Sequence, residues 1–271
     1  MTNHPGLVIA VDGPAGSGKS TAARGVARAL GLRYLDTGST YRALTWWLLA
    51  RGVDVSEPDA VAAVLARGDD PPEPPAAVRS GRQADPRGQH GYAGLARGDD
   101  PPARLARPVI EAGTDPDAPA ICVDGRDVAG LIRTREVSNA VSAVASIPQV
   151  RRHLVAMQQG IIADTLAAGE GIVAEGRDIG TVVAPDAPVK VYLTASETVR
   201  ARRRTADLAA DPAATVAVTR AEQARRDSSD APQMARAADA VEIDTTALGL
   251  DEVIREIVRL ADCRRAGAWT R

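Results

Sequence analysis

The chain has no phenylalanine, two cysteines and only two lysines, Lys19 and Lys190, among its 271 residues. Cys122 and Cys263 lack metal-ligand spacing, so they exclude a disulfide scaffold and indicate a reducing compartment. No apolar run reaches the roughly 18 residues that a membrane-spanning helix needs, and the first residues lack the layout of a signal peptide. We therefore expect a soluble cytoplasmic protein with no membrane partner.

Positive and negative charges are nearly equal in number. The formal net charge is −2 and the isoelectric point about 6.0, so the chain lacks the basic field that non-specific binding of nucleic acid requires. Arginine and alanine are abundant, in the manner of a base-composition bias, so a single arginine is weak evidence of a site. We expect small-molecule substrates and no nucleic-acid partner.

A glycine-rich stretch, VDGPAGSGKST (11–21), lies between an apolar run and an alanine-rich one. It matches G-x-x-x-x-G-K-[ST], in which backbone N–H groups surround an anion and the lysine reaches the β and γ phosphates. The flanking patterns predict a strand and then a helix, as the motif requires, and the Ser20 hydroxyl is expected on Mg²⁺. The stretch predicts a nucleoside triphosphate site formed by Gly13, Pro14, Ala15, Gly16, Ser17, Gly18, Lys19, Ser20 and Thr21.

Strand and helix patterns alternate along most of the chain. Strands are predicted at 32–36, 171–176, 189–195 and 240–244, a hairpin at 120–130 turning at Asp124-Gly125, and helices at 39–52, 57–68, 134–146, 148–168, 196–208, 214–227 and 250–263. This order predicts an α/β fold, with a parallel sheet covered by helices on both faces. Ligands of such sheets bind beyond the carboxyl ends of the strands, where the glycine-rich loop also lies.

One segment interrupts this order. LARGDDPP occurs at 65–72 and again at 95–102, and the residues between are rich in Pro, Gly, Arg and Ala. Two copies are too few for a solenoid, so we interpret 66–113 as a duplicated, disordered surface loop without a catalytic role.

Four further patches follow predicted strands or lie on predicted helices. DTGSTYR (36–42), GRDIGTVV (176–183), RARRRT (200–205) and ARRDSSD (224–230) would place hydroxyls, carboxylates and guanidinium groups in one cleft. Phosphoryl transfer requires positioning and positive charge around the phosphate oxygens, and guanidinium groups supply both. The patches together favour a kinase, although each alone also fits a solvated helix face.

These patches, with the glycine-rich loop, DVAGLIRTREVSNAVSAVASIPQVRRHL and ADAVEIDTT, resemble bacterial cytidylate kinases along most of the chain outside about 66–113. The resemblance implies a P-loop kinase core from 1–52 and 169–271, a lid at about 196–206, and a CMP-binding insert at 53–168. It also implies ATP as donor, Mg²⁺ as cofactor, and CMP or dCMP as acceptor. We expect the protein to be a monomer.

The resemblance also assigns roles to residues. It implies that Thr37, Ser142, Arg151 and Asp178 recognise cytosine, that Arg42 and Arg177 hold the acceptor phosphate, and that Arg226 and Asp230 meet the sugar. Tyr41 completes the CMP site. Lys19, Arg177 and Arg203 are the implied catalytic residues, Arg203 through a lid over the donor phosphates.

The chain departs from the family pattern after Asp230. The segment before the last strand is several residues shorter, and no arginine follows Asp230 until Arg236. One guanidinium implied for the acceptor phosphate is therefore missing, unless Arg225 or Arg236 takes its place. A kinase of another small acceptor, such as shikimate or a different nucleotide, and a non-catalytic nucleotide-binding protein remain the alternatives.

Overall fold

The computed structural model describes residues 6–66, 106–207 and 215–266. Its elements are β1 (Val8–Asp12), α1 (Lys19–Leu30), β2 (Arg33–Asp36), α2 (Thr37–Ala50), α3 (Pro58–Leu65), β3 (Ile110–Ala112), β4 (Ile121–Val123), β5 (Arg126–Asp127), α4 (Arg135–Ser146), α5 (Pro148–Ala167), β6 (Ile172–Gly176), β7 (Val189–Thr194), α6 (Glu197–Asp207), α7 (Val216–Asp230), β8 (Val241–Asp244) and α8 (Leu250–Arg265). Short helical turns cover Leu131–Arg133, Ile179–Val183 and Ala231–Gln233.

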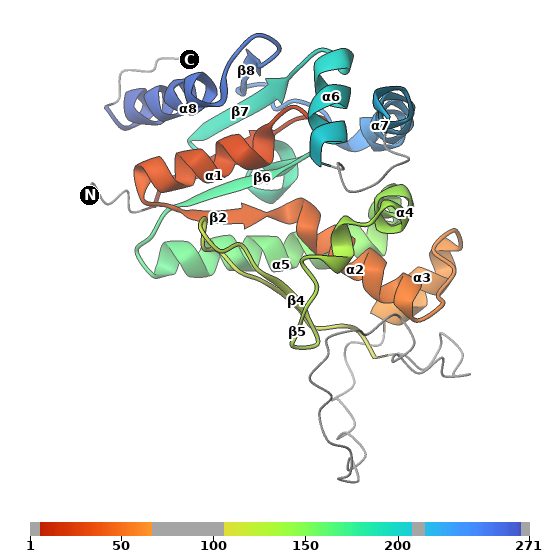
Figure 1. Cartoon of the computed structure of the whole chain (residues 1–271). Helices are drawn as coiled ribbons and strands as arrows, with labels where there is room; N and C mark the ends of the chain where they lie inside the picture. The colour runs from red at the N-terminus through yellow and green to blue at the C-terminus, as the bar shows by residue number, and fades with distance from the viewer. Residues whose placement is uncertain (1–5, 67–105, 208–214, 267–271) are drawn as a thin grey trace, which may run out of the picture.

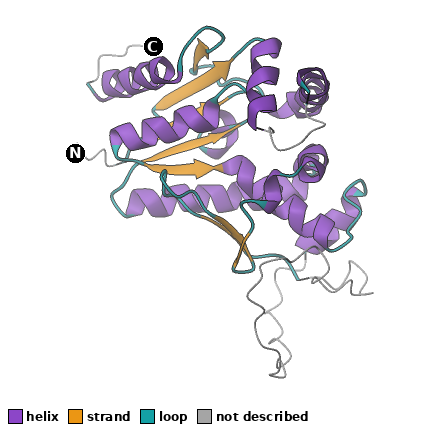
Figure 2. Cartoon of the chain, viewed as in Figure 1, coloured by secondary structure: helices purple, strands orange, loops and turns teal. Residues whose placement is uncertain are grey.

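The larger sheet has five parallel strands in the order β2-β6-β1-β7-β8 (Figures 1 and 2). β1 lies at its centre, and its residues are all buried. A strand whose two faces are both buried in a parallel sheet has a continuous apolar sequence, and residues 7–11 show this pattern. All five strands end at the same edge, where the glycine-rich loop begins.

Side chains alternate between two cores along each strand. Ile9 and Val11 pack with α1 and α8, whereas Val8 and Ala10 pack with Ile162 of α5 and Ile179. The sheet therefore has helices on both faces, as the alternation of strands and helices predicted (Figure 1).

A third core holds the insert together. It joins α2, α3, α4 and α5 to a small antiparallel sheet of order β3-β4-β5. Trp46 and Trp47 of α2 lie in this core, and the Trp47 indole N–H donates to Asp124 Oδ2 at 3.0 Å. Asp124 has φ 51°, which marks the β4–β5 turn and confirms the predicted hairpin at Asp124-Gly125.

Two local predictions need correction, and one helical turn was not predicted at all. The loop expected over 66–113 ends earlier, because Ile110–Ala112 form β3 and pair with β4; residues 67–105 lie outside the described residues. The sequence also gave no sign of the π-helical turn Ile179–Val183, since five residues are too few to show a helical period. Helix α2 begins at Thr37 rather than at 39, because Asp36 caps it by accepting the Ser39 N–H at 3.0 Å.

Candidate active site

The glycine-rich loop joins β1 to α1 and needs its glycines. Gly13, Gly16 and Gly18 have φ of 147°, 78° and 90°. A side chain at Gly13 would lie 2.2 Å from Leu193 O, and one at Gly16 would lie 2.7 Å from Arg200 O. The loop is therefore closely packed against β7 and α6, with its backbone free to face an anion.

A cleft of about 820 Å³ lies above this loop. Of the predicted triphosphate residues, Ala15, Gly16, Gly18, Lys19, Ser20 and Thr21 line it, whereas Gly13, Pro14 and Ser17 do not. These three shape the loop: Pro14 O accepts the Lys19 ammonium at 3.2 Å, and Ser17 O accepts the Thr245 hydroxyl at 3.0 Å.

The floor of the cleft is a buried group of opposite charges. Burial and then the charge of Arg177 lower the pKa of Lys19 to about 8. Burial and then the charge of Asp36 raise the pKa of Glu175, which also accepts the Tyr34 hydroxyl at 2.9 Å and a hydrogen bond from Ser20. Sequence reasoning missed Glu175 and Asp36, which lie opposite each other in the last two residues of β6 and β2.

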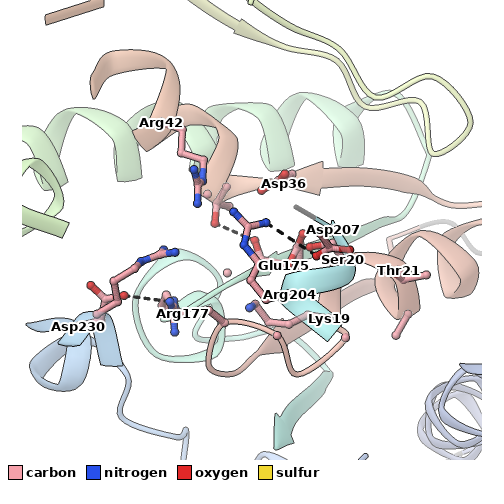
Figure 3. A pocket seen from close by; sticks show the side chains of 18 of the residues that line it. Lys19, Ser20, Thr21, Asp36, Arg42, Glu175, Arg177, Arg204, Asp207 and Asp230 are labelled. Carbon is pink, nitrogen blue, oxygen red and sulfur yellow. Dashed lines mark hydrogen bonds and ion pairs between the residues drawn. The ribbon is translucent and has the colours of Figure 1, made fainter. Parts of the chain in front are cut away.

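Arginines from four different elements meet across the cleft from the loop. Burial, followed by the charges of Arg226, Arg204 and Arg133, lowers the pKa of Arg42 to about 9. Burial and then Arg177 lower that of Arg226 to about 10. Figure 3 shows Arg42 and Arg204 pointing into the same space, with Lys19 on its opposite side. Such mutual repulsion makes this space a site for a multiply charged anion.

Other residues fix the orientation of these arginines. Arg42 Nη1 donates to Ile132 O at 3.1 Å and to Ser138 Oγ at 2.9 Å. Arg177 pairs with Asp230 at 2.9 Å, as Figure 3 shows, and with the Sδ of Met234 at 3.1 Å. The arginines are thus held in place by the protein, as a preorganised anion site requires.

A second polar group lies in the same cleft, on the side of the insert. Arg151 pairs with Asp178, and Thr37 donates to Glu175 O at 2.8 Å. The hydroxyl oxygens of Tyr41 and Ser142 are buried and have no hydrogen-bond partner within the described ranges. Unpartnered buried hydroxyls are costly, so they indicate a ligand that supplies the missing partners.

Three of the four arginines of α6 were predicted to lie in the cleft, and the structure places them differently. Arg200 does not line the cleft, which corrects its predicted place there: it donates to Ala15 O at 3.2 Å and pairs with Asp227 at 2.5 Å. Arg203 lines the cleft but is bound to Thr245 through Oγ1 at 2.9 Å and through O at 2.8 Å. Arg204 also lines the cleft, as predicted for this patch, and reaches its centre (Figure 3), although the resemblance assigned it no role of its own.

Neither Arg225 nor Arg236 takes the place of the guanidinium that the shortened segment after Asp230 lacks. Arg225 is exposed, and Arg236 pairs with Glu242 at 3.3 Å; neither lines the cleft. Gln233 of the turn that follows Asp230 does line it.

A phosphate loop at the carboxyl edge of a parallel sheet, faced by an arginine cluster within one cleft, defines the class of P-loop phosphotransferases. The family model for cytidylate kinase matches residues 9–70 and 104–263. The chain is 41% identical to a cytidylate kinase of Streptomyces griseus (98% of this chain, 97% of the relative) and 43% identical to one of Streptomyces coelicolor (97% and 96%). It also matches, at 40% identity over 93% of its length, a bifunctional pantoate ligase/cytidylate kinase of a Synechococcus, covering 42% of that protein. The chain belongs to the cytidylate kinase family.

Proposed function

We propose that the protein transfers the γ-phosphoryl group of ATP to CMP or dCMP, giving ADP and CDP or dCDP. The observation that carries this proposal is the pair of anion sites facing each other in one cleft: the glycine-rich loop with Lys19, and the cluster of Arg42, Arg177 and Arg226. Transfer between two phosphates needs such opposed sites and little further chemistry from the protein.

The donor occupies the loop side of the cleft. Its phosphates meet the N–H groups of the loop and the Lys19 ammonium, which balances charge at the bridging oxygen as the bond breaks. The end of the cleft beside α8, lined by Leu248, Leu250 and Val253, takes the donor base. Arg203, fixed on Thr245, lies between this end and the loop, which supports its proposed place beside the donor.

Ser20 and Glu175 fit a magnesium ion. Both offer the hard oxygen ligands that Mg²⁺ prefers, and they lie together at the loop, because Ser20 donates a hydrogen bond to the buried Glu175 carboxylate. Bound with the triphosphate, the ion would neutralise charge on the phosphate oxygens.

The acceptor occupies the arginine side. Arg42, Arg177 and Arg226 hold its phosphate. The charge of Arg177 helps to lower the pKa of Arg226, and this proximity favours a phosphate role for Arg226 in addition to the sugar role that the resemblance implies. Asp230 orients Arg177 before substrate arrives. The hydroxyls of Tyr41 and Ser142, with Thr37 and the Arg151–Asp178 pair, form the polar wall for cytosine.

We further propose that α6 acts as the lid, that residues 53–168 act as the CMP-binding insert, and that the enzyme works as a monomer in the cytoplasm. Over the described residues, no helix has the length and apolarity to cross a bilayer.

A coupled assay of ADP release tests the acceptor. CMP, dCMP, UMP, AMP and shikimate are compared at equal concentration, with ATP and Mg²⁺. We expect turnover with CMP and dCMP to exceed that with each of the other three by at least tenfold. Preference for UMP, AMP or shikimate would assign the cleft to another acceptor, and ATP binding without any turnover would favour a nucleotide-binding protein.

A further inference from the structure

Asp12 is a buried carboxylate that none of the proposed substrate contacts uses. It is the last residue of β1, directly before the glycine-rich loop, and is 6% exposed. Its Oδ1 accepts the Ile179 N–H and its Oδ2 accepts the Gly180 N–H, each at 2.8 Å. One side chain therefore links the strand that carries the donor loop to the turn that follows Arg177 and Asp178.

These two N–H groups are the first free donors of the turn Ile179–Val183. The residue before such a turn commonly satisfies them, and Asp178 stands at that place with a carboxylate suited to the task. Asp178 makes no capping hydrogen bond, however, and pairs with Arg151 on the wall of the cleft. Because Asp12 caps the turn from the neighbouring strand, the carboxylate of Asp178 is not needed as a cap. It can therefore face the cleft together with Arg151.

The charges around Asp12 come from both halves of the site. Burial raises the pKa of Asp12 most; its bonds to Gly180 and Ile179 oppose that effect, Asp178 adds to it, and Lys19 opposes it. Gly180 of the turn lies between Asp12 and Lys190 of β7. A methyl added to it would lie 3.4 Å from Asp12 Oδ2 and 3.2 Å from Lys190 Cδ. The turn is thus held between Asp12 and β7, with little room to move.

We propose that Asp12 is a positioning residue for phosphoryl transfer: it sets the spacing between the donor loop and the acceptor groups Arg177 and Asp178. This inference rests on the proposed function. In-line transfer depends on that spacing, and an error near 1 Å costs on the order of 10²-fold in rate.

Asp12→Asn tests the proposal, because the amide keeps the shape but turns one acceptor into a donor facing an N–H group. We expect kcat with saturating ATP and CMP to fall by about 10- to 100-fold, with KM for ATP changed less than threefold, since the loop glycines are untouched. Asp124→Asn is the matched control: Asp124 also accepts two hydrogen bonds, from the Trp47 indole and the Val109 N–H, but does not line the cleft. It should lower the melting temperature and leave kcat unchanged.

Gly180→Ala provides a second variant if Asp12→Asn fails to fold. Its methyl presses on the same turn while Asp12 is retained, and we expect kcat to fall several-fold with KM for ATP constant. Turnover of CMP by the wild-type protein tests the proposed function itself. It is independent of how kcat and KM differ between each variant and the wild type. The inference is overturned if Asp12→Asn, or Gly180→Ala in its place, keeps kcat within threefold of wild type and loses only melting temperature, as the control does.

Discussion

Arg204 is the residue we expect to supply the guanidinium that the shortened segment after Asp230 lacks. Its side chain is 21% exposed, and its ion pair with the mostly exposed Asp207 is long, at 3.8 Å. Arg204→Met keeps the aliphatic stem and removes the charge. A charge-assisted hydrogen bond to phosphate contributes about 1.5–3 kcal/mol, which corresponds to roughly 10- to 100-fold in affinity.

The expected loss lies near the lower end of that range. Removing Arg204 also relieves the repulsion that lowers the pKa of Arg42 and of Arg226, and this gain offsets part of the lost bond. We expect Kd for CMP, measured by calorimetry without donor, to rise about tenfold. Binding of cytidine, which has no phosphate, should change less than twofold.

Arg202→Met is the matched control for this prediction. Arg202 lies on the same helix but is exposed and does not line the cleft, so its loss should leave CMP binding unaltered. Arg225→Met and Arg236→Met should also have no effect. If either of them weakens CMP binding tenfold while Arg204→Met does not, that arginine, and not Arg204, supplies the missing guanidinium.

Three other outcomes are expected. Lys19→Ala should lower kcat by about 10²-fold or more without unfolding the protein, because the ammonium balances charge on the transferring group; near-normal turnover would contradict this. ATP affinity should fall as pH rises from 7 to 9, because the lowered pKa of Lys19, about 8, means that its positive charge is lost over this range. Calorimetry at each pH measures this fall, which should be absent in Lys19→Ala. Deleting residues 65–94, which leaves one copy of LARGDDPP, should keep CMP turnover within a few-fold because the removed composition buries little apolar surface; insoluble protein or lost CMP binding would refute it.

The sequence predicted the sheet, its helices and the phosphate loop because each has a local signature: a buried apolar run, a helical period, or fixed glycine spacing. Asp12 and Glu175 have none. Each is a single carboxylate within the last two residues of a strand, and only the pairing of β1 with β6 brings the two together at the site.

Arg203 and Arg204 illustrate a second limit. Neighbouring residues of a helix point about 100° apart, so the choice between them depends on how α6 rotates against the loop. The contacts that fix this rotation are Arg200 with Ala15 O and Arg203 with Thr245, and both join segments far apart in the chain. No pattern within RARRRT contains that information.

The transfer of label from [γ-³²P]ATP to CMP tests the central claim most directly. Purified protein is incubated with labelled ATP, Mg²⁺ and CMP, and the products are separated by chromatography. Label should appear in CDP, in proportion to the ADP formed, and should remain in ATP when Lys19 is replaced by Ala. Label released as inorganic phosphate, with no labelled CDP, would contradict the account, because the arginine cluster would then hold no acceptor.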